Sequence, residues 1–74
     1  MPSKRKPKLI PLRELRALCA EAGVEIGEHE SANVWDILFD GCYVAVMEPS
    51  DRRCRRNLKA FCIGLIAMRK AGEL

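Results

Sequence analysis

The strongest structural constraint in this 74-residue sequence is the pair Asp40-Gly41, which separates two short apolar runs. The runs cover residues 34–39 and 42–47, and both are rich in the β-branched and aromatic residues typical of strands. Asp-Gly is a preferred pair for a two-residue type I′ turn, because both turn residues must then adopt positive φ. The pattern predicts a β-hairpin in which Phe39 lies opposite Cys42.

The expected register assigns the hairpin side chains to two faces. One face should pack on the core and hold Trp35, Ile37, Phe39, Cys42, Val44 and Val46. The other should hold Val34, Asp36, Leu38, Tyr43, Ala45 and Met47, which is far more apolar than a solvated face normally is. The sequence therefore predicts a partner interface on this second face, made of Val34, Leu38, Tyr43 and Met47.

Helical patterns flank the strands. Pro11 suits the first turn of a helix, apolar residues then recur at helical spacing, and Gly23 is a plausible end. A short strand is expected over 24–26, followed by a polar loop over 27–33. After Pro49, Ser50 is the expected N-cap of a helix running to about residue 71. Its core stripe should contain Cys54, Leu58, Phe61, Leu65 and Met68.

This order predicts an α+β fold of the α-β-β-β-α kind, with a three-stranded antiparallel sheet and two helices on one face. Residues 11–74 should form a single domain, and residues 1–10, which are polar and basic with no period, a flexible arm. No apolar run approaches the roughly 20 residues that span a bilayer, so no membrane partner is expected. The four cysteines contain no Cys-x-x-Cys pair, which favours a reduced, cytoplasmic protein.

No pattern in the sequence predicts catalysis, a metal or a cofactor. Cys19, Cys42 and Cys54 fall at expected core positions and Cys62 near the edge of a core stripe, so packing is the favoured role for all four. His29 is the only histidine, and no nucleophile–base pair is recognisable. The acids Glu25, Glu28, Glu30 and Asp36 lack a diagnostic metal-ligand spacing. The chain is predicted not to be an enzyme.

The net charge of +3 hides a strong segregation along the chain. Residues 1–11 carry four bases and no acid. Residues 12–50 carry two bases against eight acids, and residues 51–74 carry seven bases against two acids. The chain therefore has two positive zones separated by an acidic one.

The second positive zone opens the last predicted helix with Arg52, Arg53, Arg55, Arg56 and Lys59. The helix dipole already places positive charge there, so stability alone would favour acids. A helix start with free amide groups and arginines suits phosphate or another anion. The arm adds Lys4, Arg5, Lys6 and Lys8. These patterns favour a small, non-enzymatic nucleic-acid-binding protein that contacts the phosphate backbone; the plainer alternatives are a solvated basic face and a solubilising or import-signal tail.

The element order and the stretch Ser50-Asp51-Arg52-Arg53-Cys54-Arg55 resemble the double-stranded-RNA-binding domain over residues 11–71. In that family the second helix opens with a basic cluster on the major-groove phosphates, which implies duplex RNA as a ligand of Arg52, Arg53 and Arg55. Gly27-Glu28-His29 is partly similar to the family's minor-groove loop, and Glu14 is the nearest match to its first-helix contact. The same order occurs in mRNA-cleaving toxins, where a histidine is catalytic, but the acidic setting of His29 argues against cleavage.

A function of a different class stays open beside nucleic-acid binding. Small basic single-domain proteins are frequent among phage and mobile-element products that block a host protein complex, including inhibitors of CRISPR effectors. The acidic middle and the open apolar face suit such a partner. Ile63 and Ile66, on the far side of the last helix, form a second candidate interface. A two-fold homodimer would cover one of these patches with its own copy.

Overall fold

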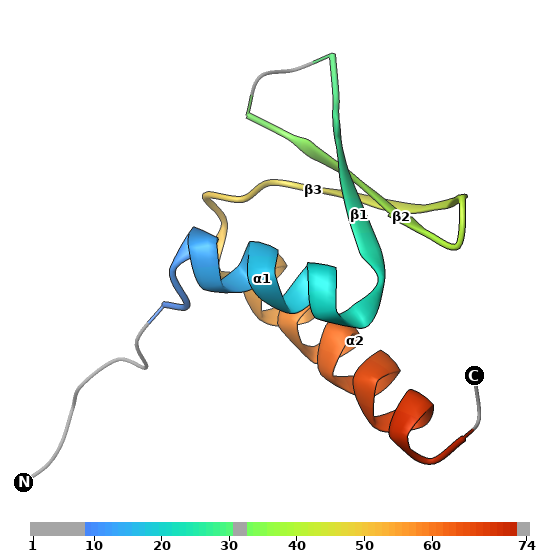
Figure 1. Cartoon of the computed structure of the whole chain (residues 1–74). Helices are drawn as coiled ribbons and strands as arrows, with labels where there is room; N and C mark the ends of the chain where they lie inside the picture. Colours follow the sequence, from blue (N-terminus) through green and yellow to red (C-terminus); the bar gives the residue numbers. More distant parts are fainter. Residues whose placement is uncertain (1–8, 31–32, 73–74) are drawn as a thin grey trace, which may run out of the picture.

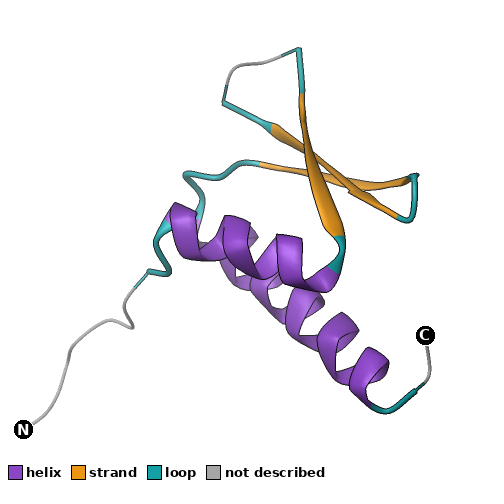
Figure 2. Ribbon diagram, in the orientation of Figure 1, coloured by secondary structure: helices purple, strands orange, loops and turns teal. Residues whose placement is uncertain are grey.

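The computed structural model describes residues 9–30 and 33–72, which fold as two helices and one antiparallel sheet (Figure 1). The elements are α1 (Leu12–Ala22), β1 (Val24–Glu28), β2 (Trp35–Phe39), β3 (Cys42–Met47) and α2 (Arg52–Lys70). The strand order is β1-β2-β3, so β2 is central and the other two are edges. Both helices lie on the same side of the sheet (Figure 2), which confirms the predicted α-β-β-β-α architecture.

The two helices run in the same general direction and are joined at three levels. Near the start of α1, Arg55 of α2 donates to the carbonyl of Ile10 at 2.8 Å. In the middle, the Cys19 and Cys62 sulfurs are 3.6 Å apart. At the end of α1, the Arg69 guanidinium donates to the carbonyls of Glu21 and Ala22, each at 3.0 Å. A cation thus satisfies carbonyl groups that a helix C-terminus leaves without partners.

The helix and turn boundaries follow from local chemistry. Gly23 ends α1 in the left-handed conformation with φ 80°, which favours glycine. Asp40 and Gly41 both have positive φ, 54° and 76°, as a type I′ turn requires. The predicted pairing of Phe39 with Cys42 is confirmed. The conformations of Gly23, Asp40 and Gly41 could be predicted from the sequence because each depends on only one or two residues.

The core lies between the helices and one face of the sheet. Ile10 also packs against it, although residues 1–10 were predicted to be a flexible arm. Residues 1–8 of that arm lie outside the described part of the chain. The buried core residues come from every element and are Leu15, Cys19, Ala22, Val24, Trp35, Ile37, Met47, Leu58, Cys62 and Leu65.

The predicted register holds as far as the pair of Leu38 with Tyr43 but is wrong beyond it, because a bulge interrupts the hairpin between Ile37 and Leu38. Leu38 pairs with Tyr43 but Ile37 pairs with Ala45, so β3 carries one extra residue. A bulge shifts every later side chain to the opposite face. Met47, which pairs with Trp35, is therefore buried, whereas Val44 and Val46 are about half exposed at 45% and 44%.

Several other expectations are corrected by the structure. The N-cap of α2 is Asp51 and not Ser50, and β1 extends through Gly27 and Glu28, which were expected in a loop. Cys42 is exposed at the hairpin end, whereas Cys62 is completely buried. Met68, expected in the core stripe of α2, is exposed at 41%.

Because Cys62 is buried, the free energy of unfolding should decrease at alkaline pH. Burial, and next the neighbouring Cys19, raise the pKa of the Cys62 thiol to about 12. The unfolded chain releases this proton near the ordinary thiol pKa of about 8.5. The contribution of the Cys62 thiol to the free energy of unfolding is therefore fully present below that pH and is lost as pH rises toward 12. Urea unfolding at pH 7.0, 9.0 and 10.5 should show a progressive decrease in the free energy of unfolding.

The matched variants are Cys62→Ala and, on the exposed thiol, Cys42→Ser. Cys62→Ala should be less stable at pH 7 but should lose less stability above pH 9, whereas Cys42→Ser should follow the unaltered chain. Burial also raises the pKa of Cys19, so a smaller dependence of the same sign should remain in Cys62→Ala. Equal slopes in all three proteins above pH 9 would contradict this assignment.

Candidate nucleic-acid interface

The start of α2 is capped by its own chain. The Asp51 carboxylate accepts hydrogen bonds from the backbone N–H groups of Arg53, at 2.7 Å, and Cys54, at 3.2 Å. The sequence was expected to present free amide groups to an anion, and at these two residues that expectation is wrong. A phosphate at this helix start would therefore be bound mainly by side chains.

Arg55 differs from the other predicted contact residues. It is half-buried, and its guanidinium donates to the carbonyls of Pro49 and Ile10. These two carbonyls belong to segments far apart in the sequence, one leading into α2 and the other into α1. Arg55 thus joins the two helix starts, and its Nε and Nη1 groups are already occupied.

Four predicted contact residues are exposed on the first two turns of α2: Arg52, Arg53, Arg56 and Lys59. None of them forms an ion pair with an acid in residues 9–30 and 33–72; the ion pair found there joins His29 and Asp36. The first turn of α2 contains no acid. We call these four residues the α2 basic cluster. Its positive charge is reinforced by the helix dipole.

The contact between Arg55 and Ile10 also fixes where the N-terminal arm joins the domain. Ile10 lies beside the start of α2, and Lys8 precedes it by two residues. The predicted contacts Lys4, Arg5, Lys6 and Lys8 lie outside the described residues. Covalent connectivity alone keeps them within roughly 7–22 Å of Ile10, at about 3.6 Å per residue. The described start of the chain, at residues 9–10, therefore lies beside the start of α2.

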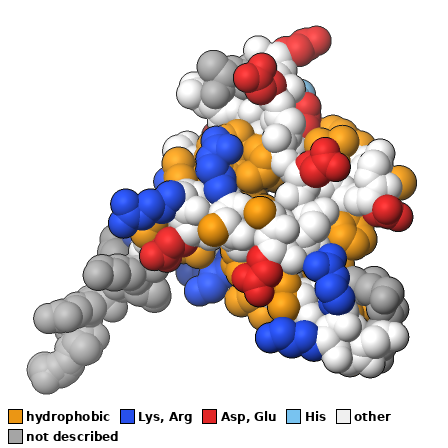
Figure 3. Space-filling model, viewed as in Figure 1, with side chains coloured by type: hydrophobic (Ala, Val, Ile, Leu, Met, Phe, Trp, Pro, Cys, Tyr) orange, Lys and Arg blue, Asp and Glu red, His pale blue; other side chains and the backbone are white. Residues whose placement is uncertain are grey.

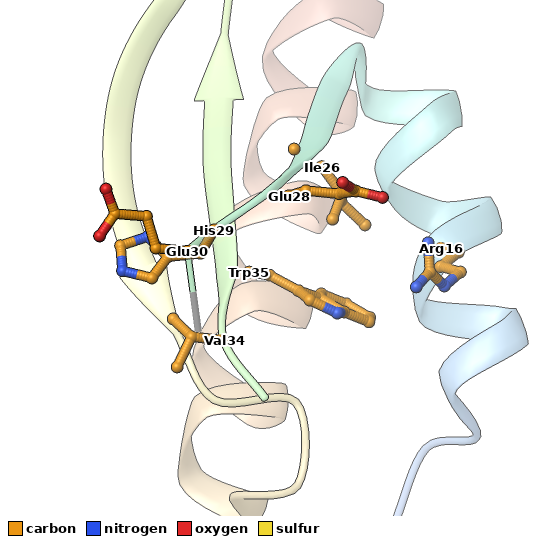
Figure 4. Close-up of a pocket in the computed structure, with 8 residues that line it drawn as sticks. Arg16, Ile26, Glu28, His29, Glu30, Val34 and Trp35 are labelled. Atoms are coloured by element: carbon orange, nitrogen blue, oxygen red, sulfur yellow. The ribbon is translucent and has the colours of Figure 1, made fainter. Parts of the chain in front are cut away.

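The end of the sheet where β1 leads toward β2 is acidic. A pocket of about 620 Å³ opens there between α1, β1 and the start of β2. Figure 4 shows Trp35 and Glu28 extending toward Arg16 of α1; the Arg16 guanidinium lies 4.5 Å from the centre of the Trp35 ring, in a cation–π contact. Glu30 also lines the pocket, so two carboxylates would repel a phosphate.

His29 lies at this acidic end and is paired with a carboxylate. Its Nδ1 is 2.8 Å from Oδ1 of Asp36, and both side chains are partly exposed. The pair resembles a base oriented by an acid, but no Ser, Thr or Cys is among the described residues that line the pocket. Glu28 and Glu30 flank His29 in the sequence, so this loop offers a phosphate backbone mainly negative charge. In Figure 3 acidic side chains reach the sheet end of the molecule, and Lys and Arg lie mainly over the helical layer.

Only some residues of the predicted apolar interfaces are exposed. Met47 belongs to the core, Val34 and Leu38 are half-buried, and Tyr43 is 60% exposed. On α2, Ile63 is exposed whereas Ile66 packs against the core. Sequence reasoning missed the exposed Val44 and Val46, because their exposure results from the bulge in β3.

Within residues 9–30 and 33–72, no group of three or more His, Cys, Asp and Glu side chains is placed to hold a metal ion. No helix in this part of the chain combines the length and apolar character needed to cross a membrane. The chain matches no protein-family model, no curated protein and no solved structure.

Proposed function

We propose that this protein binds the phosphate backbone of duplex nucleic acid without catalysing a reaction. The observation that carries the proposal is the α2 basic cluster, which presents four exposed cations with no acidic partner among the described residues. Exposed bases at a helix N-terminus do not stabilise the fold, because the dipole there favours acids. An external anion is the partner that compensates them.

The spacing of the cluster suits a polyanion. Arg52, Arg56 and Lys59 recur at intervals of four and three residues, which places them on one side of the helix. They span about 10 Å of helix axis at 1.5 Å per residue, the length of about three base-pair steps at 3.4 Å each. One row of cations can therefore follow one strand, and Arg53 lies to its side.

Duplex RNA is the favoured form of the ligand. The support is the element order and the basic start of α2, both of which are similar in character to the double-stranded-RNA-binding domain. Arg55, one of the three residues implied by that resemblance, is bonded to carbonyls, so Arg52 and Arg53 are the contacts we retain. Four free cysteines support a reduced, cytoplasmic site of action.

A salt titration with duplex RNA and duplex DNA of matched sequence tests the proposal. Each phosphate contact releases counterions, so the logarithm of affinity should fall linearly with the logarithm of salt concentration. The four contacts of the α2 basic cluster alone predict a slope on the order of −4 on B-DNA, or roughly a 100- to 300-fold loss between 50 and 200 mM salt, and contacts from the arm would steepen it. Fluorescence anisotropy measures both quantities.

The arm supplies an internal comparison. Deleting residues 1–8 removes Lys4, Arg5, Lys6 and Lys8 while leaving the α2 basic cluster intact, so it should make the slope shallower without abolishing binding. Tighter binding of RNA than DNA would support duplex RNA as the ligand. No measurable binding of either duplex at 50 mM salt contradicts the proposal.

A further inference from the structure

Strand β3 is an edge strand with unusual composition. It is last in the order β1-β2-β3, so one side of its backbone has no strand partner among the described residues. Residues 42–46 are all exposed, and the whole of Cys42–Met47 contains neither a charge nor a proline. Edge strands are normally protected from pairing by charged residues or proline. Strand β1, the other edge, has Glu25 and Glu28.

An apolar groove of about 210 Å³ runs beside this edge. Val44, Ala45 and Val46 form its sheet wall, and Cys54, Asn57 and Phe61 of α2 form much of the other. Successive side chains of a strand point to opposite faces. A strand added to β3 would therefore place alternate side chains over the groove and against α2, so the backbone edge and the groove form one surface.

We infer that this surface binds a second copy of the same chain, with β3 antiparallel to β3 about a two-fold axis. A two-fold pairing sets residues 42–47 against themselves, and with no charge in the segment it opposes no like charges across the strand. The same pairing of β1 would bring carboxylates together. Val44, Ala45 and Val46, which line the groove, are all apolar, so each copy offers the other an uncharged, apolar surface.

The N-terminal arm is a poorer occupant of this surface. Residues 1–8 contain four bases and two prolines, whereas β3 provides no acid to pair with the bases, and proline removes a backbone donor from a ladder. The bulge in β3 increases its twist, and two-stranded ribbons tolerate strong twist. A short strand pair with two small grooves would bury about 1,000 Å² of surface in total, which is at the lower end of the range for specific interfaces. The dimer should therefore form at high micromolar concentration.

Centring the pair between Val44 and Ala45 has an electrostatic consequence. Gly41 of one copy then lies opposite Glu48 of the other, so the carboxylates of Asp40 and Glu48 from different copies become neighbours. Salt screens this repulsion and does not weaken apolar burial. Dimerisation should therefore be unchanged or strengthened between 50 and 500 mM NaCl, whereas the proposed nucleic-acid binding should weaken. The two proposals can thus fail independently.

Sedimentation equilibrium of the full chain over 10 µM to 1 mM tests the inference. The unaltered protein should approach about twice the 8.3 kDa chain mass. Val44→Lys, which introduces the kind of charge found on protected edges, should weaken association by at least about 100-fold. Ile63→Lys is the matched control, because Ile63 is similarly exposed, at 49%, but lies on α2 away from β3. Circular dichroism should confirm that both variants fold.

Backbone hydrogen exchange supplies a second readout. Amides of β3 should exchange more slowly as concentration rises, and amides of β1 should not. A monomer at 1 mM, masses that increase beyond the dimer, or association lost in Ile63→Lys but kept in Val44→Lys would each overturn the inference. If Val44→Lys does not fold, the concentration dependence of hydrogen exchange in the unaltered chain still tests the inference.

Discussion

Leu15→Ala is expected to lower the free energy of unfolding by about 3 kcal/mol. Leu15 is completely buried, on the face of α1 that packs into the core. Its truncation removes three carbons from water-excluded packing and leaves a cavity, and the two effects add. A domain of this size should have a total stability of roughly 4–11 kcal/mol. The variant should therefore lose between about a quarter and most of that stability.

Urea unfolding followed by circular dichroism measures this change. The midpoint should fall while the dependence on urea concentration stays the same, since the surface exposed on unfolding changes little. Ile63→Ala is the control, because Ile63 is half exposed and alanine favours a helix. It should change stability by less than about 1 kcal/mol. Equal effects of the two substitutions would contradict the position of Leu15 at the centre of the core.

Reversing three charges of the α2 basic cluster is expected to weaken duplex binding by at least about 100-fold at 100 mM salt. The variant carries Arg52→Glu, Arg53→Glu and Arg56→Glu, which remove three phosphate contacts and add three repulsions. The fold should be at least as stable, because acids in the first turn of a helix interact favourably with its dipole. Fluorescence anisotropy and thermal unfolding on the same samples measure both effects.

Two single variants define the specificity of this result. Lys70→Glu changes the net charge as much as Arg56→Glu does, but at the opposite end of α2, so it should weaken binding less. Arg55→Met should behave in the reverse way, with a stability loss of about 2 kcal/mol and little effect on binding by the folded protein. The Arg55→Met substitution removes the charge-assisted hydrogen bonds from the guanidinium to the carbonyls of Ile10 and Pro49. Equal effects of Arg56→Glu and Lys70→Glu would indicate attraction by net charge alone.

Much of the fold could be predicted because its signals are local. Asp40-Gly41 determines a turn through the φ angles of two adjacent residues, and Gly23 ends a helix in the same way. Leu15 and Cys19 recur at helical spacing and are buried in α1 as predicted. These features depend on few neighbours, and the sequence contains those neighbours.

The register of β3 could not be predicted because its residues do not distinguish two faces. In β2, Asp36 between Trp35 and Ile37 marks which side chains point inward. In β3 all six residues are apolar, so a one-residue shift exchanges one apolar set for another and alternation cannot specify the register. The bulge, the burial of Met47 and the exposed valines were therefore decided by packing against α1 and α2.

The positions of the arginines in α2 could be predicted from the sequence, but their contacts depend on the tertiary structure. The sequence by itself determined that five bases open the last helix, because a capped helical pattern begins where they occur. Only the folded chain separates Arg55 from Arg56, since it brings the carbonyl of Ile10, 45 residues away, to 2.8 Å from the Arg55 guanidinium. Helical periodicity reports which side of a helix a residue occupies, but not which distant backbone group meets it there. That depends on how the helices pack, which no local pattern encodes.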